Sequence, residues 1–271
     1  LVGLAGFSLQ VGNYHVPAER TLKLFVSWIG GTVEPHSSDY SDVVVLKLRL
    51  PRIIMVLLVG ATLGMTGCVS QGLFRNPLVS PFILGISAGA SFGAAFAIVF
   101  LSRVPFSLDV MAALGGFLAV FAAYMVARRP GGAVPRLALV LSGIIVSSFF
   151  SALVGILQYI ADAETQLPAI TFWMMGGLWN ASWGQIFSIV WIVILCELII
   201  ISQRWKLNLL SLGEKTSFSV GINVKRDRTI LLVVATVGTT LVISITGLIG
   251  WVGLITPHLA RKMFGSESSF S

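Results

Sequence analysis

A hydrolase-like motif lies at residues 85–89, where the sequence GISAG matches the pattern G-x-S-x-G. In hydrolases this motif places a nucleophilic serine on a strained turn between a strand and a helix. An intramembrane serine protease would pair Ser87 with a histidine on another span, and His258 is the candidate. The flanks of Ser87 are apolar and predict no strand, and no pattern brings the two residues together. We therefore interpret Ser87 as a small packing residue and keep the protease as an alternative.

A near match to the end of a phosphate-binding loop lies at residues 213–216, GEKT. The Walker A motif requires glycine, lysine and serine or threonine in direct succession, with another glycine five residues before them. Glu214 interrupts this order and would repel a phosphate, and Asn208 occupies the position of the earlier glycine. The segment is therefore no nucleotide cradle, and any ATP must be handled by a partner subunit.

Neutral polar residues within the apolar runs are the remaining candidates for a transport pathway. Among the ionisable residues, Glu197 alone sits clearly inside a run. A proton-coupled carrier needs ionisable groups at membrane depth, so it is disfavoured but stays an alternative. Some of the neutral residues must hydrogen-bond neighbouring helices, and the rest can line a wide, weakly binding pathway. They are Ser70, Gln71, Ser87, Ser91, Ser142, Ser147, Ser148, Ser151 and Gln158. No histidine or cysteine cluster has metal-ligand spacing, so iron or cobalt would have to move inside a chelate.

The composition places these residues in a membrane protein. Hydrophobic residues make up 56% of the 271 and charged residues 11%, whereas soluble domains carry about 25% charged residues. The net charge of +7 comes from basic residues clustered in short loops, which the positive-inside rule explains without nucleic acid. Cys68 and Cys196 both lie in apolar runs, so a disulfide framework is not expected. We predict an all-α, polytopic membrane helix bundle.

The apolar runs define the spans of this bundle, since a bilayer core of about 30 Å requires about 20 apolar residues in a helix. Residues 1–14 are read as the tail of a truncated first helix, which brings the count to about eight spans. Residues 15–48 form an extramembrane loop with one short helix around Ala18 to Trp28. Trp173 to Trp183 is rich in glycine and too short to cross, so it is predicted to be a half-helix. The remaining spans are expected at 53–74, 82–102, 110–127, 137–161, 184–202, 229–248 and 251–263.

Small residues recur four apart within these runs. The pairs are Gly60 and Gly64, Gly85 and Gly89, and Gly89 and Gly93. Such pairs let two helix backbones approach closely in lipid. They predict a compact bundle and specify no function.

The basic loops set the orientation. Arg75, the segment 128–136, the loop 203–228 and the pair Arg261-Lys262 all fall on one side when the spans are counted, and that side is predicted to be cytoplasmic. Lys47, Arg49 and Arg52 are exceptions on the opposite side, where Asp39 and Asp42 also lie. A chance cluster beside these two acids is the alternative to a functional role for the basic residues.

Six stretches resemble one known family in order along nearly the whole chain. They are RLPR at 49–52, QGLFRNPL at 71–78, LGISAG at 84–89, WMMGG at 173–177, LGE at 212–214 and GLIGWVGLITPHLAR at 247–261. Together they resemble the permease family of the iron-siderophore, haem and cobalamin ABC importers. The resemblance implies ten spans, so 1–271 is read as one transmembrane permease domain with a truncated N-terminal span and without the C-terminal spans.

The resemblance also implies partners. Two copies of the chain would enclose a central pathway, two ATPase subunits would dock on the cytoplasmic side, and a substrate-binding protein would dock outside. The permease would carry a metal chelate across the cytoplasmic membrane by alternating access, hydrolyse no ATP itself and need no cofactor of its own.

The family assigns roles to particular positions. The loop 203–228 would couple to the ATPase through Leu212, Gly213, Glu214 and Gly221, with a short helix from Glu214 to Val220; an ordinary amphipathic loop is the plain alternative. Arg49 and Arg52 would face the binding protein. Asn76 and Leu78 would lie where the pathway narrows, although turn chemistry explains Asn76-Pro77 equally well. Ser87 and Ser147 are the candidates for the pathway itself.

Overall fold

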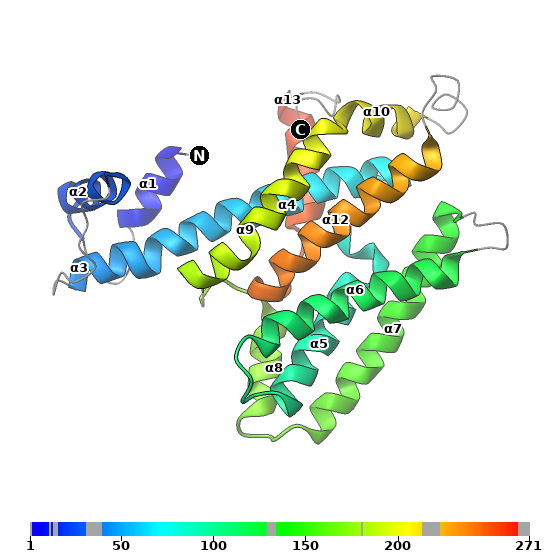
Figure 1. Ribbon diagram of the computed structural model, residues 1–271, viewed down its shortest axis with the longest axis horizontal. Helices are drawn as coiled ribbons and strands as arrows, with labels where there is room; N and C mark the ends of the chain where they lie inside the picture. Colours follow the sequence, from blue (N-terminus) through cyan, green and yellow to red (C-terminus); the bar gives the residue numbers. More distant parts are fainter. Residues whose placement is uncertain are drawn as a thin grey trace. The chain divides into compact units, whose positions relative to one another are not determined.

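The computed structural model describes residues 2–10, 12, 16–30, 40–128, 134–179, 181–212 and 223–264, and the regular elements in these ranges are all helices (Figure 1). Five helical segments are long and apolar enough to cross a membrane. The first, Tyr40–Phe74, joins α3 (Tyr40–Asp42), the π-helical η1 (Val43–Arg49) and α4 (Leu50–Phe74). The others are α6 (Ser107–Ala127), α7 (Arg136–Ile160), α9 (Trp183–Ser202) and α12 (Val224–Thr246).

The shorter elements connect or flank these segments. They are α1 (Val2–Gln10), α2 (Ala18–Ile29), the 3-10 turn η2 (Pro81–Leu84), α5 (Ile86–Phe100), α8 (Gln166–Met175), α10 (Arg204–Leu212) and α13 (Val252–Phe264). The predicted all-α membrane bundle is confirmed, and the predicted short helix near Ala18 is α2.

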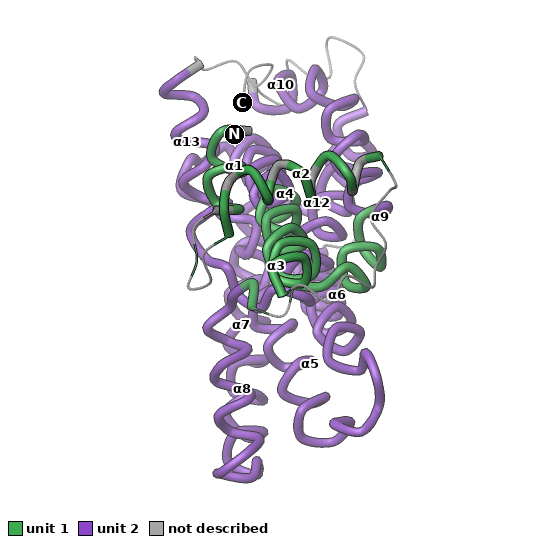
Figure 2. The backbone as a smooth tube through the Cα atoms, turned by 90° about the vertical axis from the view of Figure 1, so that its left-hand side faces the viewer, with its two compact units in different colours: residues 1–59, 178–190 green, residues 60–177, 191–271 purple. Residues whose placement is uncertain are grey.

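The chain forms two compact units, coloured separately in Figure 2. Residues 1–59 and 178–190 form the smaller unit, and residues 60–177 and 191–271 form the larger one. The smaller unit has its own apolar core, in which Leu9, Val16, Leu24, Val45 and Leu50 are buried together. Helix α2 contributes Leu24 to this core from one face and keeps Glu19 and Lys23 exposed on another, joined by an ion pair of 2.6 Å.

Close contact of α5 with α6 organises the larger unit. Gly89 and Gly93 on α5 face Gly115 and Met111 on α6 so closely that a Cβ at any of the three glycines would meet the other helix's backbone. Alanines such as Ala90, Ala94 and Ala112 are fully buried around this crossing. The predicted packing role of the Gly89 and Gly93 pair is confirmed.

The run predicted as one span over 82–102 is divided in the structure. Ser80 Oγ accepts a hydrogen bond from Phe82 N at 3.3 Å and begins the 3-10 turn η2, which ends at Gly85. Gly85 has φ of +88°, a left-handed conformation that glycine adopts without strain. Helix α5 starts only after this turn, so 15 residues of the run are α-helical.

The half-helix predicted at Trp173 to Trp183 lies earlier, because α8 covers Gln166–Met175. Asp162 initiates it: its Oδ1 accepts hydrogen bonds from Thr165 N at 2.8 Å and from Thr165 Oγ1 at 2.7 Å. Gly176, with φ of +66°, terminates it, and Gly177 N then donates to Thr246 O at 2.7 Å on α12. Polar capping and a left-handed glycine therefore set boundaries that hydropathy alone placed wrongly.

Replacing Asp162 with alanine is expected to loosen the start of α8. The hydrogen bonds from Thr165 and the backbone N–H of Glu164 lower the pKa of Asp162 below its usual value of 3.8. A lowered folded-state pKa means that the contribution to stability is complete above pH 3.8 and is lost as the pH falls further, through the folded pKa. Amide hydrogen exchange of residues 166–175 should be several-fold faster in Asp162→Ala at neutral pH. Asp162→Asn, which keeps an acceptor but cannot titrate, should lose the acid dependence; an unchanged acid dependence in that variant would contradict the assignment.

Candidate functional site

The bend after α4 is shaped by its own polar groups. Arg75 has a left-handed backbone with φ of 52°, and Asn76 Oδ1 accepts a hydrogen bond from Leu78 N at 3.0 Å. This is the local turn chemistry expected of asparagine. The Leu78 side chain is 78% exposed, so the bend presents an apolar side chain outward. The gate role of Asn76 and Leu78 stays a prediction. The hydrogen bond that the Asn76 side chain accepts is explained by turn formation.

Arg75 joins this bend to the end of α10. Its Nη2 donates to Leu210 O at 2.8 Å and its Nε donates to the same oxygen at 3.2 Å. The last carbonyls of a helix have no partner within the helix and carry partial negative charge, so a guanidinium there is favourable. The side chain that directly follows α4 therefore holds the C-terminal turn of α10.

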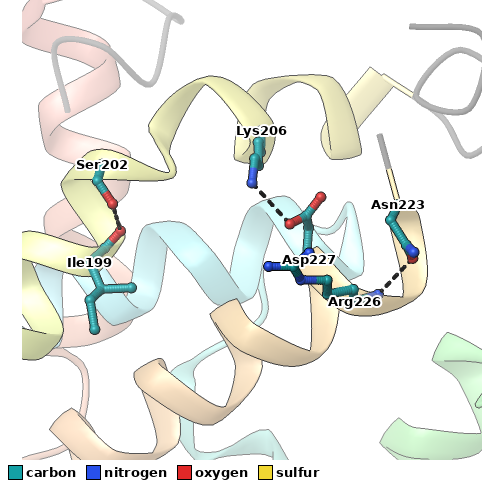
Figure 3. A network of polar contacts seen from close by, with 6 residues as sticks. All are labelled: Ile199, Ser202, Lys206, Asn223, Arg226 and Asp227. Atoms are coloured by element: carbon teal, nitrogen blue, oxygen red, sulfur yellow. Dashed lines mark hydrogen bonds and ion pairs between the residues drawn. The ribbon is translucent and has the colours of Figure 1, made fainter. Parts of the chain in front are cut away.

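The same short helix is fixed to α12 by an ion pair, drawn in Figure 3. Lys206 Nζ lies 3.0 Å from Asp227 Oδ1. The Asp227 side chain is only 7% exposed, and it lies in the first turn of α12, where a negative charge complements the helix dipole. Asn223 caps the same turn, since its Oδ1 accepts from Arg226 N at 3.1 Å.

Helix α10 is thus bonded on two sides just before the predicted coupling segment. Leu212 is its last residue, whereas Gly213, Glu214, Gly221 and the predicted short helix lie outside the described residues. Within the loop predicted at 203–228, α10 and the first turn of α12 are helical. Charge-assisted hydrogen bonds therefore link α10 to the bend after α4 and to α12.

A cavity of about 230 Å³ lies beside this arrangement, between the end of α4, α10 and α13. Gln71 connects two of its walls: its Nε2 donates to Leu254 O on α13 at 3.3 Å, and its Oε1 accepts from Arg261 Nη2. Arg75 and Arg261 both line the cavity. Gln71 therefore bonds α13 to the last turn of α4. Arg75, which bonds to α10, follows directly after that turn.

Two of the predicted pathway serines lie close to the left-handed turn before α5. Ser147 Oγ donates to Gly143 O at 2.7 Å within α7, and a Cβ on Gly85 would lie 3.2 Å from that Oγ. Ser87 is the second residue of α5 and is half-buried. The element before Ser87 is the 3-10 turn η2, whereas a nucleophile elbow requires a strand. Ser87 and Ser147 therefore stay predicted pathway residues, and Ser87 is poorly suited to be a protease nucleophile.

Glu197, on α9, is bonded to a neighbouring helix. Thr62 Oγ1 on α4 donates to Glu197 Oε1 at 2.9 Å. A hydrogen bond of this kind between spans joins helices in lipid. Gly238 on α12 faces the same place, because its Cβ would lie 3.2 Å from Thr62 Cγ2. The bond gives Glu197 a role in helix packing.

Arg49 and Arg52 both contact backbone carbonyls within the smaller unit. Arg49 Nη1 donates to Leu9 O at 2.6 Å. Arg52 Nε donates to Leu178 O at 3.0 Å, and its Nη2 donates to Trp179 O at 3.3 Å. Arg49 is half-buried, whereas Arg52 is exposed. The two arginines therefore differ in their surroundings. Arg49 bonds to α1 from a half-buried position, whereas Arg52 has an exposed side chain.

Comparison with known proteins decides the family. The model of the FecCD transport family matches residues 1–271. The chain belongs to the FecCD transport family. It is 36% identical over 270 residues to the molybdate import system permease MolB of Haemophilus influenzae, covering 98% of this chain and 78% of that protein. It is 40% identical over 234 residues to an iron chelatin transport system permease of Helicobacter pylori, covering 86% and 70%.

A solved structure of a metal-chelate type ABC transporter in an inward-facing conformation has a similar fold. Its TM-score is 0.84 at 35% identity, and the match covers 99% of this chain and 80% of that one. The chain is accordingly a multi-pass membrane protein of a transport family, which removes the ground for the protease alternative.

Several bonding residues of this FecCD-family chain were not found from the sequence. The sequence indicates only loop charges at Arg75, Lys206 and Arg261, and it does not single out Asp227. Asp227 did carry a signal, since it is an acid between Arg226 and Arg228, four residues after Asn223, a helix N-cap residue. The bond of Arg75 to Leu210 had no such signal, because a carbonyl acceptor is present at every residue.

Proposed function

We propose that the chain is the membrane-spanning subunit of an ATP-driven importer that carries a metal chelate by alternating access. The observation that best supports this is the double attachment of α10, through Arg75 and through Lys206–Asp227, directly before residues 213–222. Each attachment stabilises α10, and the two together hold it to the bend after α4 and to α12. A segment that transmits force from an ATPase subunit needs a stiff connection to the helices that move.

In this mechanism two copies of the chain enclose the pathway, and each presents residues 212–221 to an ATPase subunit on the cytoplasmic side. ATP binding draws the ATPase subunits together and displaces the segment. Through Asp227 the displacement reaches α12, and through Arg75 it reaches the bend that carries Asn76 and Leu78. Hydrolysis allows the return. The coupling is reciprocal, so cargo arriving at the pathway changes the affinity of the ATPase sites for ATP.

The cargo is proposed from the relatives. The iron chelatin permease and the metal-chelate type transporter favour a chelated metal, and the small neutral side chains at Ser87 and Ser147 suit a bulky, weakly held complex. The molybdate permease makes a small oxyanion the second candidate. The two classes differ in size and charge, so uptake measurements separate them.

Reconstitution tests the whole proposal. The chain, with its partner ATPase and binding protein, is placed in proteoliposomes and supplied with an iron–siderophore complex, haemin, cobalamin or molybdate. ATP-dependent uptake of one chelate is the expected result. Uptake that follows an imposed pH gradient without ATP would overturn the proposal in favour of a proton-coupled carrier. Uptake of molybdate alone would overturn the assignment of a metal chelate as the cargo.

Docking of the binding protein is expected to depend on Arg52 more than on Arg49. Arg52→Glu should weaken docking about tenfold at low salt, because an exposed pair contributes about 0–1 kcal/mol and two copies act together. The loss should shrink as salt screens the interface, while basal ATP hydrolysis persists. Affinity is measured by surface plasmon resonance with the assembled complex in nanodiscs.

Two controls separate docking from local structure. Lys47→Glu makes the same charge change on the exposed face of η1, and Arg52→Gln removes the bonds to Leu178 and Trp179 without reversing the charge. Equal loss of affinity in Lys47→Glu and Arg52→Glu would show that docking depends on the net charge of this surface and not on Arg52 in particular. Reduced membrane insertion with unchanged affinity per assembled complex would make Arg52 an anchor of the helix end.

A further inference from the structure

A row of hydroxyl side chains lies inside the larger unit, where α4 packs against α12. Thr62, Thr66 and Ser70 follow one another at intervals of four residues on α4, and all three are buried. Gly238 on α12 faces this row, since a Cβ there would lie 3.2 Å from Thr62 Cγ2 and 3.8 Å from Thr66 Cγ2. Buried hydroxyls in a membrane helix bond either to a neighbouring helix or to a carbonyl of their own helix.

Two hydroxyls near the predicted cytoplasmic end of this contact use their hydrogen atoms within their own helices. Ser70 Oγ donates to Thr66 O at 2.8 Å, and Thr236 Oγ1 on α12 donates to Leu232 O at 2.8 Å. A hydroxyl group has one hydrogen to donate and two lone pairs that accept. The oxygens of Ser70 and Thr236 can therefore only accept further hydrogen bonds.

A third hydroxyl still has its hydrogen to donate. Thr239 lies three residues after Thr236 on α12 and is fully buried, and its Oγ1 makes no hydrogen bond to any residue that the structure describes. An unbonded hydroxyl in an apolar interior costs free energy. Buried polar groups are for this reason nearly always bonded to protein or to ordered water.

A cavity of about 10 Å³ lies where these three residues meet. Ser70, Thr236 and Thr239 line it, and the rest of its wall is apolar, including Leu73 of α4 and Pro81 of η2. Space of about this size holds one water molecule, and a water placed there needs two to four polar partners. Three hydroxyl-bearing residues from two helices meet that requirement.

We propose that this cavity is a binding site for one buried water molecule that joins α4 to α12. The water donates one hydrogen to Ser70 Oγ and the other to Thr236 Oγ1, and it accepts the hydrogen of Thr239 Oγ1. All three hydroxyls are then bonded, and the water makes three hydrogen bonds, a typical number for buried water. A metal cation does not fit this pattern, because it accepts no hydrogen and would leave the Thr239 hydroxyl without an acceptor.

The water gives α4 and α12 a polar contact that can adjust. A direct hydrogen bond between the helices would break if one helix moved along the other, whereas a bridging water is nearly as favourable and can shift with its partners. In the proposed function α12 moves when α10 is displaced, so this role rests on that function. The water site itself does not.

The sign of a stability change tests the site. Thr239→Val replaces the hydroxyl by a methyl group of similar size. With the water bound, the variant takes away the donor that the water accepts from, so the melting temperature of the purified chain in detergent should fall by about 2 °C or more. If no water is bound, valine removes a buried hydroxyl without a partner, and the melting temperature should rise. A rise would overturn the proposal.

Thr240→Val is the matched control. Thr240 is also fully buried on α12, and its Oγ1 also makes no hydrogen bond to a described residue, but it does not line this cavity. The same replacement should therefore leave the melting temperature unchanged or raise it. An equal fall in both variants would show that valine is poorly tolerated on this part of α12, and it would overturn the assignment of Thr239 to a water site.

A crystal structure of the chain at a resolution that shows ordered water tests the site directly. A density peak is expected within hydrogen-bonding distance of Ser70 Oγ, Thr236 Oγ1 and Thr239 Oγ1, and it should weaken or vanish in Thr239→Val. The absence of a peak, with Thr239 Oγ1 donating instead to the carbonyl of Ala235 four residues earlier, would overturn the proposal. Neither measurement uses an ATPase or a cargo, so a failure here is distinguishable from a failure of the proposed function.

Discussion

Replacing Gly93 with valine should sharply lower the yield and the melting temperature of the folded protein in the membrane. A Cβ at Gly93 would fall on the backbone carbonyl of Met111, and the obstacle is a helix backbone, which no side-chain rotation can relieve. Helices α5 and α6 would have to separate along the face that also holds Gly89 and Gly115. Overpacking of a core typically costs about 1–3 kcal/mol, and this contact lies at or above that range against a total stability of about 5–15 kcal/mol.

The matched control is Gly155→Val on α7, where an added Cβ meets nothing within 4 Å. Both variants place the same side chain in a membrane helix of the larger unit, so they share the change in helix propensity. Monodisperse protein recovered from membranes, and its thermal unfolding in detergent, are the measurements. Comparable yield and melting temperature for the two variants would show that the α5–α6 contact is adjustable.

The glycine pattern shows how far the sequence predicts this fold. Spacing of four correctly marked Gly89 and Gly93 as a packing face. The same spacing marked Gly60, where a Cβ would meet nothing within 4 Å, and it overlooked Gly67, where a Cβ would fall on the backbone carbonyl of Gly253 on α13. Periodicity reports that a helix has a small-residue stripe, but the partner across that stripe depends on how distant segments pack. The face was therefore predictable and the contact was not.

The site shows the same division between local and long-range physics. Hydropathy located the bend and the basic loop, because each depends on neighbours in sequence, but it misplaced the starts of α5 and α8. The bond from Arg75 to Leu210 joins residues 135 apart, and the ion pair of Lys206 with Asp227 joins residues 21 apart across residues outside the described ranges. Charge counting assigned Arg75 and Lys206 to cytoplasmic loops, and it cannot tell a loop charge that bonds to a helix from one that does not.

Removing both attachments of α10 is expected to uncouple ATP hydrolysis from transport. Arg75→Gln takes the charged donor from Leu210 O, and Asp227→Asn weakens the bond to Lys206; hydrogen bonds to charged groups contribute about 1.5–3 kcal/mol each. The segment 213–222 is unaltered, so under the proposed mechanism the ATPase subunits should still bind. Hydrolysis should continue at close to its basal rate, while ATP-dependent uptake falls at least tenfold because displacement of α10 no longer reaches α4 and α12 together.

Each single variant should retain part of the coupling, since one attachment remains, and the loss in the double variant should exceed the product of the single losses. Arg204→Gln is the control: it removes an exposed charge from the first residue of α10 without touching either bond. Uptake and phosphate release are measured on the same proteoliposomes, so their ratio is independent of the amount reconstituted. Loss of ATPase binding in the double variant would instead make these residues part of the docking surface.

A charge swap separates the ion pair from mere loss of a side chain. Lys206→Asp alone places two carboxylates together and should uncouple strongly, and Asp227→Lys alone should do the same with two ammonium groups. Combining the two restores opposite charges about 3 Å apart in the wild-type geometry. The rescue should be partial, because a lysine in the first turn of α12 opposes the helix dipole that Asp227 complements. If the swapped pair transports no better than either single variant, then Asp227 acts as a cap of α12, and Arg75 is left as the attachment that carries the movement of α10.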